Sequence, residues 1–550
     1  MISSLLAAVA TFVAPDLSLD NYKDRLVSCV TNLDGETCRY LTLTNAGCTT
    51  PWKLDTGFRA TTPAFAVTPG RDFAVTARVR GTYNLRFARG AMECKVDWLD
   101  ATGAKTGDPF HFGLDVGASR WRNARACGTV PAGAASAKVT LGADEPNFRT
   151  GQWLALASVS FADYPSGAVP ADSEPLPEEF YGPPLTQEEM TYADDKISPS
   201  GFPLVDGRPF FPIGIYGVWK SEHNGQDFDR AFDELKRCGF NTVQTYRTTR
   251  GPEFAAFLDA ADRHGLKVFV APGPDNAYTN GLTANILSEK RHDCLLAWYI
   301  ADDTSQHTIP AALRTLSAKC HALDPRRLTA QADGVGPSYL SKYAPFVDAT
   351  DVFLPEIYPV TLERPDGTEV PHVVRDMKTI AADIKAHPGR RKSVWPIIQH
   401  FEGWGAWKRF PTFDELRAMS YLAVIHGANG ITWYTYSVSN RGKGAPATPE
   451  HWRELTTVSK ELAAISDDLV CPNAAVQPAV TVTSGPRKDA LGFDSVSVLV
   501  KESPKGNLLL AANSSTNAVR ATIALAHPLT LDFAPYGVRV IRLNDVTCHP

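Results

Sequence analysis

The sequence has no excess of either charge. It holds 55 Lys and Arg residues against 60 Asp and Glu residues, which gives a formal net charge of -5. Proteins that hold a phosphate backbone need clustered cationic side chains, so this balance argues against nucleic acid as a partner. Hydrophobic residues make up 44% of the chain, an ordinary globular composition, and 550 residues are enough for two to four domains.

Membrane-spanning runs and metal-binding patterns are also missing. Beyond residue 14 no stretch approaches the roughly 20 apolar residues that span a bilayer, so we expect no membrane domain. The ten cysteines form no Cys-x-x-Cys pair, and no His cluster has zinc spacing, so we expect neither a metal nor another cofactor. Five cysteines fall in the first quarter of the chain, where some could be disulfide-bonded in an exported protein: Cys29, Cys38, Cys48, Cys94 and Cys127.

Residues 1–14 form an apolar segment with small residues that suit a signal-peptidase site, although the usual positive charges before it are absent. We interpret them as a candidate signal peptide and expect a secreted or periplasmic protein.

The two ends of the chain have the pattern of β-structure. Residues 19–164 contain short alternating apolar runs separated by Gly, Pro and Asn, which predicts an antiparallel β-sandwich. Residues 165–200 are rich in Pro and acidic residues and lack periodicity, as is typical of a linker. Alternating strands return over 472–550, which predicts a second, smaller β-sandwich.

The centre of the chain, residues 201–470, alternates buried-strand runs with amphipathic helical stretches. Eight such runs occur, at 209–217, 241–247, 267–271, 295–301, 328–332, 351–358, 393–401 and 430–436. Eight β-α units in about 260 residues fit a (β/α)8 TIM barrel, whose active-site groups lie at the carboxyl ends of the strands. The predicted fold is therefore a central barrel flanked by N-terminal and C-terminal β-sandwich domains.

Two of these strand runs end in carboxylates. The run at 295–301 is followed by Asp302 and Asp303, and the run at 393–401 by Glu402. An Asp pair after a strand is also a common helix cap, which is the competing interpretation. Two carboxylates facing one cleft are the minimum requirement for cleavage of a glycosidic bond.

Part of the N-terminal region, notably residues 98–103, 130–141 and 153–161, resembles the jelly-roll carbohydrate-binding modules attached to many polysaccharide-degrading enzymes. In those modules the last strand usually carries acidic residues, whereas this chain has Ala157 and Ser158. Both sugar binding and a purely structural role therefore stay open for this domain.

The central region resembles the large clan of retaining glycoside hydrolases that includes cellulase-like and β-galactosidase-like enzymes. In that clan the fourth strand ends in Trp-x-x-x-Asn-Glu, whose Glu is the acid/base, and the seventh strand ends in the nucleophilic Glu. Here Trp298 is followed by Asp302 and Asp303, which stand in place of the Asn and the Glu. The resemblance implies Asp303 as the acid/base and Glu402 as the nucleophile.

Further residues fit the same template and are expected to bind substrate together with Asp302. Arg247 would hold the nucleophile ionised, or else form a surface ion pair, and Tyr358 would lie beside the nucleophile. Trp433 resembles the sugar platform of the clan, with a core Trp as the alternative. His400 would line the cleft or be a structural histidine, and Glu356 is the main rival carboxylate.

The sequence therefore predicts a glycoside hydrolase that cleaves a poly- or oligosaccharide by a retaining double displacement. Because Asp is shorter than Glu, a wider gap at Asp303 could admit water and favour inversion instead. The main alternative is a carbohydrate-binding protein that has kept the barrel and lost catalysis. A metal-dependent hydrolase of the same fold is a weaker alternative, since no His-x-His set ends a strand.

Overall fold

The computed structural model describes residues 8–13, 18–22, 26–43, 57–81, 86–87, 95–112, 114–115, 120–143, 153–169, 178–273, 281–335, 343–361, 365–403, 407–437 and 443–543. The chain divides into two compact units, one formed mainly by residues 1–183 and the other by most of residues 184–550. Each unit is described by itself.

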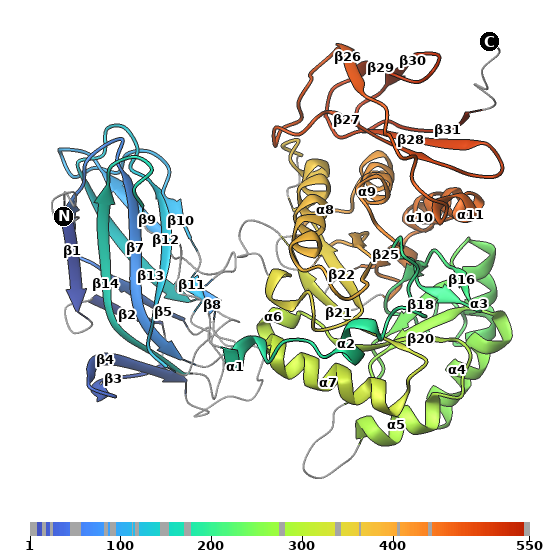
Figure 1. The fold of residues 1–550 in the computed structure, drawn as a ribbon, viewed down its shortest axis with the longest axis horizontal. Helices are drawn as coiled ribbons and strands as arrows, with labels where there is room; N and C mark the ends of the chain where they lie inside the picture. Colours follow the sequence, from blue (N-terminus) through green and yellow to red (C-terminus); the bar gives the residue numbers. More distant parts are fainter. Residues whose placement is uncertain are drawn as a thin grey trace. The chain divides into compact units, whose positions relative to one another are not determined.

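The N-terminal unit contains two antiparallel sheets (Figure 1). One has the order β12-β7-β14-β4-β3, with β1 paired to β14, and the other has the order β10-β9-β13-β5-β2, with β6 paired to β13. Phe73, Trp98 and Phe161 pack in the core that the sheets share. This arrangement confirms the predicted β-sandwich. Its strands are β1 (Ala8–Val13), β2 (Ser18–Tyr22), β3 (Leu26–Leu33), β4 (Glu36–Leu43), β5 (Gly57–Thr61), β6 (Phe65–Ala66), β7 (Asp72–Gly81), β9 (Lys95–Leu99), β10 (Phe110–His111), β12 (Arg122–Thr129), β13 (Ser136–Ala143) and β14 (Trp153–Tyr164), beside the short pair β8 (Arg86–Phe87) and β11 (Leu114–Asp115).

The segment interpreted as a signal peptide contributes a strand. Its described residues form β1, which pairs with β14 from Ala8 opposite Asp163 to Val13 opposite Ser158. Export remains a prediction. Among the N-terminal cysteines, Cys29 and Cys38 are free thiols, and Cys48 and Cys94 lie outside the described residues.

The predicted linker contains short regular elements where it is described. Helix α1 (Glu178–Tyr181) is followed by α2 (Gln187–Thr191), which begins with a capping box between Thr186 and Glu189. The hairpin β15 (Leu204–Val205) and β16 (Arg208–Pro209) then leads into the barrel.

Eight parallel strand positions close into a barrel, which confirms the predicted (β/α)8 fold (Figure 1). Strand β17 pairs with both β18 and β25, and β21 pairs with β22, so the sheet has no free edge. The seventh position is divided into two strands at Pro396, whose nitrogen carries no hydrogen. The strands are β17 (Ile213–Ile215), β18 (Thr242–Thr245), β19 (Lys267–Val270), β20 (Leu295–Ala301), β21 (Leu328–Gly334), β22 (Val352–Ile357), β23 (Ser393–Val394), β24 (Ile397–Gln399) and β25 (Ile431–Tyr434).

Helices follow most of the strands and cover the outer face of the barrel. They are α3 (Phe228–Arg237), α4 (Pro252–His264), α5 (Gly281–Glu289), α6 (Thr304–His307), α7 (Pro310–Leu323), α8 (Glu369–Ala386), α9 (Phe413–Ile425) and α10 (Pro449–Ala464), with α11 (Ser466–Leu469) after them. Within the described residues β21 is followed only by a 3₁₀ turn, Ala344–Phe346. No helix in the described ranges has the length and apolarity needed to cross a membrane.

The last strands form two three-stranded antiparallel sheets beside the barrel (Figure 1). Leu510 on β28 and Val538 on β31 belong to the same apolar core as Leu416 of α9, so this domain packs on the barrel's helices. This confirms the predicted C-terminal β-sandwich. One sheet contains β26 (Val480–Ser484), β29 (Val519–Ile523) and β30 (Leu529–Phe533), and the other contains β27 (Val496–Lys501), β28 (Asn507–Asn513) and β31 (Val538–Leu543).

Candidate active site

A cluster of tyrosines lies at the carboxyl ends of the barrel strands. It consists of Tyr216, Tyr246, Tyr299, Tyr358 and Tyr434, and we call it the tyrosine cluster. The ring of Tyr216 lies 6.0 Å from that of Tyr246 and 6.1 Å from those of Tyr299 and Tyr434, and Tyr358 lies 5.9 Å from Tyr434. All of these rings except that of Tyr246 pack with Phe269, Leu354 and Trp395 on the inner side of the barrel. The mouth of the barrel is therefore lined with aromatic faces.

Asp302 lies against this cluster, directly after β20. The hydroxyl of Tyr299 donates a hydrogen bond to Asp302 Oδ1 at 2.6 Å. The carboxyl reaches solvent, but the protein that surrounds it raises the pKa of Asp302 to about 6, even though the Tyr299 hydrogen bond acts in the opposite direction. The charges of Asp303 and Asp333 raise this pKa further. Asp302 is thus a carboxyl group that gains and loses a proton close to neutral pH.

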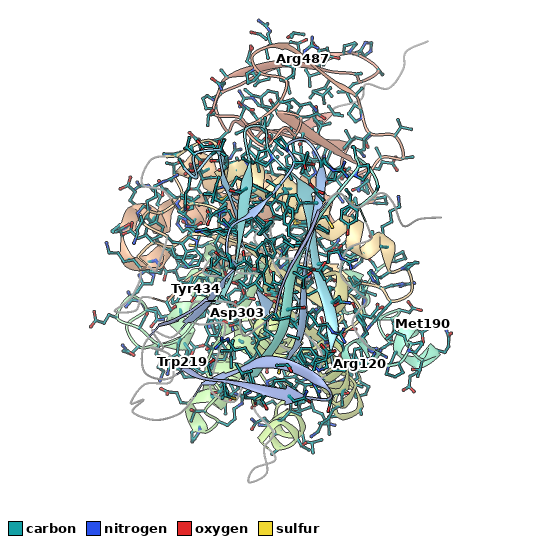
Figure 2. The ribbon with its side chains drawn as sticks, turned by 90° about the vertical axis from the view of Figure 1, so that its left-hand side faces the viewer. Arg120, Met190, Trp219, Asp303, Tyr434 and Arg487 are labelled. Carbon is teal, nitrogen blue, oxygen red and sulfur yellow. The ribbon has the colours of Figure 1, made fainter. Side chains whose placement is uncertain are left out.

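Asp303, the predicted acid/base, occupies the turn between β20 and α6. Its φ of 47° lies in the left-handed region, which Asp tolerates better than most residues. Its charge is one of several that raise the pKa of Tyr434, after burial, Asp302 and Glu356. The backbone reversal at Asp303, which is labelled in Figure 2, gives the two neighbouring carboxyls different surroundings. The hydrogen bond from Tyr299 goes to Asp302.

Glu356 faces the mouth from β22. Along this strand Val352 and Leu354 belong to the inner core of the barrel, whereas Phe353 and Ile357 pack outward against the helices. The alternation of a strand therefore turns Glu356 inward. Burial first, and then the charge of Glu356, raise the pKa of Tyr358. Tyr358 itself belongs to the tyrosine cluster, at the strand end predicted for it.

Glu402, the predicted nucleophile, is bound to Lys443. Lys443 Nζ lies 2.9 Å from Glu402 Oε1, and the two residues also exchange both backbone hydrogen bonds. The neighbouring Phe401 contacts the tyrosine cluster instead, with ring distances of 5.2 Å to Tyr358 and 5.3 Å to Tyr434. Phe401 therefore faces the mouth and Glu402 faces the segment at Lys443.

Arg247 lies at the exposed rim. Its guanidinium stands over the ring of Trp219 at 5.1 Å. In the described part of the chain no hydrogen bond joins Arg247 to Glu402, so the structure does not bring these two predicted partners together. The pair of Arg247 and Trp219 instead forms a cationic and aromatic stretch of the rim.

The structure corrects two other expectations. Trp433 is fully buried, and its indole N–H donates to Ser420 Oγ at 3.2 Å, so it is a core residue and not a sugar platform. His400 is also fully buried, and its Nε2 lies 3.0 Å from the backbone oxygen of His451. Burial lowers the pKa of His400 to about 3, so it is a neutral structural histidine. Trp395 and Ile397 belong to the inner core and Val394 and Ile398 to the outer one, so the alternation along this strand turns the ring of His400 away from the mouth.

Two groups of side chains in the described residues have the composition of a metal site. One joins Asp262, His292 and Cys294, and the other joins His400 with His451 and Glu454. In the first, His292 Nδ1 lies at hydrogen-bond distance from Asp262 Oδ2, 2.6 Å apart. In the second, His400 Nε2 is used by the backbone oxygen of His451. Both groups are explained as hydrogen-bonded structural clusters.

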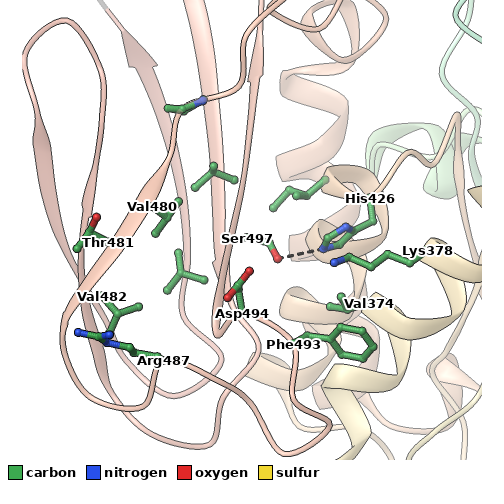
Figure 3. A pocket seen from close by; sticks show the side chains of 14 residues that line it. Val374, Lys378, His426, Val480, Thr481, Val482, Arg487, Phe493, Asp494 and Ser497 are labelled. Atoms are coloured by element: carbon green, nitrogen blue, oxygen red, sulfur yellow. Dashed lines mark hydrogen bonds between the residues drawn. The ribbon is translucent and has the colours of Figure 1, made fainter.

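A separate cavity of about 480 Å³ lies between the barrel helices and the C-terminal sandwich (Figure 3). Lys378 of α8 and His426 line one side, and Arg487, Asp494 and Ser497 line the other. His426 Nε2 lies 3.0 Å from Ser497 Oγ. Because His426 follows the end of α9, this cavity is at the face of the barrel opposite the strand ends, away from the tyrosine cluster.

Tyr358 was expected at the site, but the other tyrosines of the cluster were visible in the sequence and not recognised there. Tyr216, Tyr246, Tyr358 and Tyr434 each fall within or beside the last residues of a predicted strand run. An aromatic residue at several strand ends of one barrel is a signal for an aromatic mouth. Asp302 was assigned to substrate binding, and its contact with Tyr299 depends on side-chain directions that the sequence does not specify.

Comparison with solved structures gives distant similarities. A glycoside hydrolase family 5 protein from Bacteroides vulgatus is 14% identical, with a TM-score of 0.41, over 63% of this chain and 89% of that chain. The α-amylase of Geobacillus thermoleovorans, complexed with acarbose, is 11% identical, with a TM-score of 0.40, over 61% of this chain and 99% of that one. The N-terminal CBM22-1-GH10 modules of Clostridium thermocellum xylanase 10B, complexed with xylohexaose, are 9% identical, with a TM-score of 0.31, over 83% of this chain and 98% of that one. No family model and no curated protein matches the sequence. At these TM-scores the similarities do not identify the reaction.

Proposed function

We propose that this protein is a glycoside hydrolase that cleaves a poly- or oligosaccharide, with Asp302 as the general acid/base. The observation that carries the proposal is a carboxyl group whose pKa is raised to about 6, placed against an aromatic cluster at the carboxyl ends of barrel strands.

The chemistry of glycosidic cleavage requires such a group. The departing sugar oxygen needs a proton from an acid that is still neutral near the working pH, and the same group then removes a proton from the incoming water. An unperturbed Asp, with a pKa of about 3.9, would already be ionised. The raised pKa of Asp302 supplies the neutral form, and the hydrogen bond from Tyr299 fixes its direction.

The surroundings of Asp302 suit a carbohydrate. The C–H faces of sugars pack on aromatic rings, and the half-buried Tyr358 and Tyr434 together with the exposed Tyr246 offer such rings. Tyr216, Tyr299 and Phe401 are buried beneath them. Phenol hydroxyls also donate and accept hydrogen bonds, which matches sugar hydroxyls. Both properties support a sugar as the substrate, while its identity and linkage stay open.

We propose retention of the anomeric configuration. The charges of Asp302 and Glu356 both act on the buried phenol of Tyr216, so the two carboxyls share one small region of the mouth. A double displacement needs a compact pair, about 5 Å apart, whereas inversion needs roughly 6.5–9.5 Å. An NMR time course of the first-formed anomer tests this expectation.

A carbohydrate-binding protein without catalysis is the second candidate. It is favoured by one observation, the engagement of Glu402, the nucleophile expected from the sequence, by Lys443. The two candidates differ in turnover, and a panel of polysaccharides and aryl glycosides separates them.

The panel should be measured with the wild-type chain, with Asp302→Asn and with Asp494→Asn as a control far from the mouth. A hydrolase loses turnover on natural sugars in Asp302→Asn, loses less on aryl glycosides with acidic phenols, and keeps turnover in Asp494→Asn. A wild-type chain that binds sugars without hydrolysing any of them would refute the proposal in favour of the binding protein.

Export to the medium or periplasm is part of the proposal, supported by the apolar segment with small residues at 1–14. N-terminal sequencing of the protein recovered from each cell fraction tests it.

A further inference from the structure

The end of the seventh barrel position does not present its carboxylate to the mouth. Phe401 has its ring against Tyr358 and Tyr434, so this residue occupies the inner direction. Successive side chains on an extended segment point to opposite sides, and Glu402 accordingly points away. Its ion pair with Lys443 and the two backbone hydrogen bonds between them hold it in that direction.

The sixth position does present a carboxylate. Glu356 is half-buried, and it lies on the inner side with Leu354 and Tyr358. In the strand register Glu356 is opposite Gly334 of β21 and Ile397 of β24. It therefore comes from the second strand along from β20, whose end carries Asp302.

Resting on the proposed function, we infer that Glu356 of β22, and not Glu402, is the catalytic carboxylate that acts together with Asp302. In the first step an oxygen of Glu356 forms a bond to the anomeric carbon while the bond from that carbon to the leaving oxygen breaks. The leaving oxygen takes the proton of Asp302. In the second step water attacks the anomeric carbon and gives a proton to Asp302, and Glu356 departs with the electron pair of its bond.

The position of the partner charges supports this assignment. The charge of Glu356 raises the pKa of four tyrosines, and the charge of Asp302 raises the pKa of the same four: Tyr216, Tyr299, Tyr358 and Tyr434. Glu402 is not among the main charges that act on any of them. The two carboxyls that share surroundings are thus Asp302 and Glu356.

The two glutamates allow a matched test, because they lie at the carboxyl ends of two neighbouring barrel strands. Glu356 is near the end of β22, and Glu402 follows β24. We would compare Glu356→Gln with Glu402→Gln on the 2,4-dinitrophenyl glycoside that the wild-type chain hydrolyses fastest. Glu356→Gln should lose on the order of 10³-fold or more in kcat, since no leaving group replaces the missing attack. Glu402→Gln should stay within about fivefold of wild type, because an exposed ion pair contributes little.

A second measurement identifies the role directly. Glu356→Ala with added sodium azide should release a glycosyl azide of inverted configuration, because azide attacks from the side that the carboxylate has vacated. Circular dichroism melting curves check that each variant is folded. The assignment is overturned if Glu402→Ala gives the inverted azide and Glu356→Ala does not. A wild-type chain that is inactive on the whole panel overturns the proposed function, and this assignment with it.

Discussion

Removing the hydroxyl of Tyr299 should change the pH dependence of the reaction in a defined direction. In the structure this hydroxyl donates to Asp302 Oδ1 at 2.6 Å, and the bond favours the ionised carboxylate. Tyr299→Phe keeps the ring and its packing against Tyr216 but loses the donor. The protonated form of Asp302 then becomes more favourable, so its pKa rises above the present value of about 6.

The size of the effect follows from the strength of the bond. A hydrogen bond to a charged group contributes about 1.5–3 kcal/mol, and about 1.36 kcal/mol corresponds to a change of one in pKa. Asp302 also contacts solvent, and water replaces part of the lost hydrogen bond, so the loss should lie at the lower end of this energy range. We expect the pKa of Asp302 to rise by about 1.

The assay is the pH profile of kcat/KM on an aryl glycoside. Because the reaction needs protonated Asp302, the basic limb of the Tyr299→Phe profile should move to higher pH by about 1, and the plateau should fall by roughly tenfold as the carboxyl loses its orientation. A matched control is Tyr421→Phe, which removes a tyrosine hydroxyl that donates to Glu461 at 3.2 Å far from the mouth. If the Tyr299→Phe limb coincides with the wild-type limb while the plateau falls, Asp302 is not the titrating acid.

Three further predictions concern stability. Burial raises the pKa of Asp376 to about 7 despite its ion pair with Arg375, so the folded state binds a proton that the unfolded state releases near pH 4. Stability should fall as the pH rises from about 4 to 7, and Asp376→Asn should remove most of that fall in melting curves taken across this range. Arg390 and Asp351 form a buried ion pair, and Arg390→Ala should lower the free energy of unfolding by about 3–5 kcal/mol in urea titrations, a loss below about 1 kcal/mol being the contrary result. Trp433→Phe should cost about 1–2 kcal/mol of stability and leave KM unchanged, since the indole is fully buried.

The barrel could be predicted from the sequence because its strands are buried on both sides. Such strands are continuous apolar runs, and each of the eight predicted runs overlaps a barrel strand. The prediction of an irregular linker was less accurate, because it missed the helix α2. This helix is stabilised by the capping box of Thr186 and Glu189 and has no apolar periodicity to reveal it. Apolar periodicity does not detect a helix of five residues.

The site was harder to predict, because it depends on where each side chain points after its strand has ended. Asp302 and Asp303 are adjacent in sequence, and the left-handed backbone at Asp303 and the hydroxyl of Tyr299 distinguish them. Neither feature has a sequence signal of its own. The family pattern assigned the acid by position, whereas the hydrogen bond and the raised pKa favour the other carboxyl.

The seventh strand position shows the same limit in its simplest form. Strict alternation from Trp395, which faces the inner core, would turn Ile397, Gln399 and Phe401 inward and His400 and Glu402 outward. The register alone therefore places Phe401, and not Glu402, against the tyrosine cluster, as the ring contacts show. A motif matched by position alone ignores this alternation of side chains. Along β22 the same alternation turns Glu356 inward. Whether a carboxylate near the end of a barrel strand is catalytic is therefore judged better from the alternation of inward and outward side chains along that strand than from its match to a family motif.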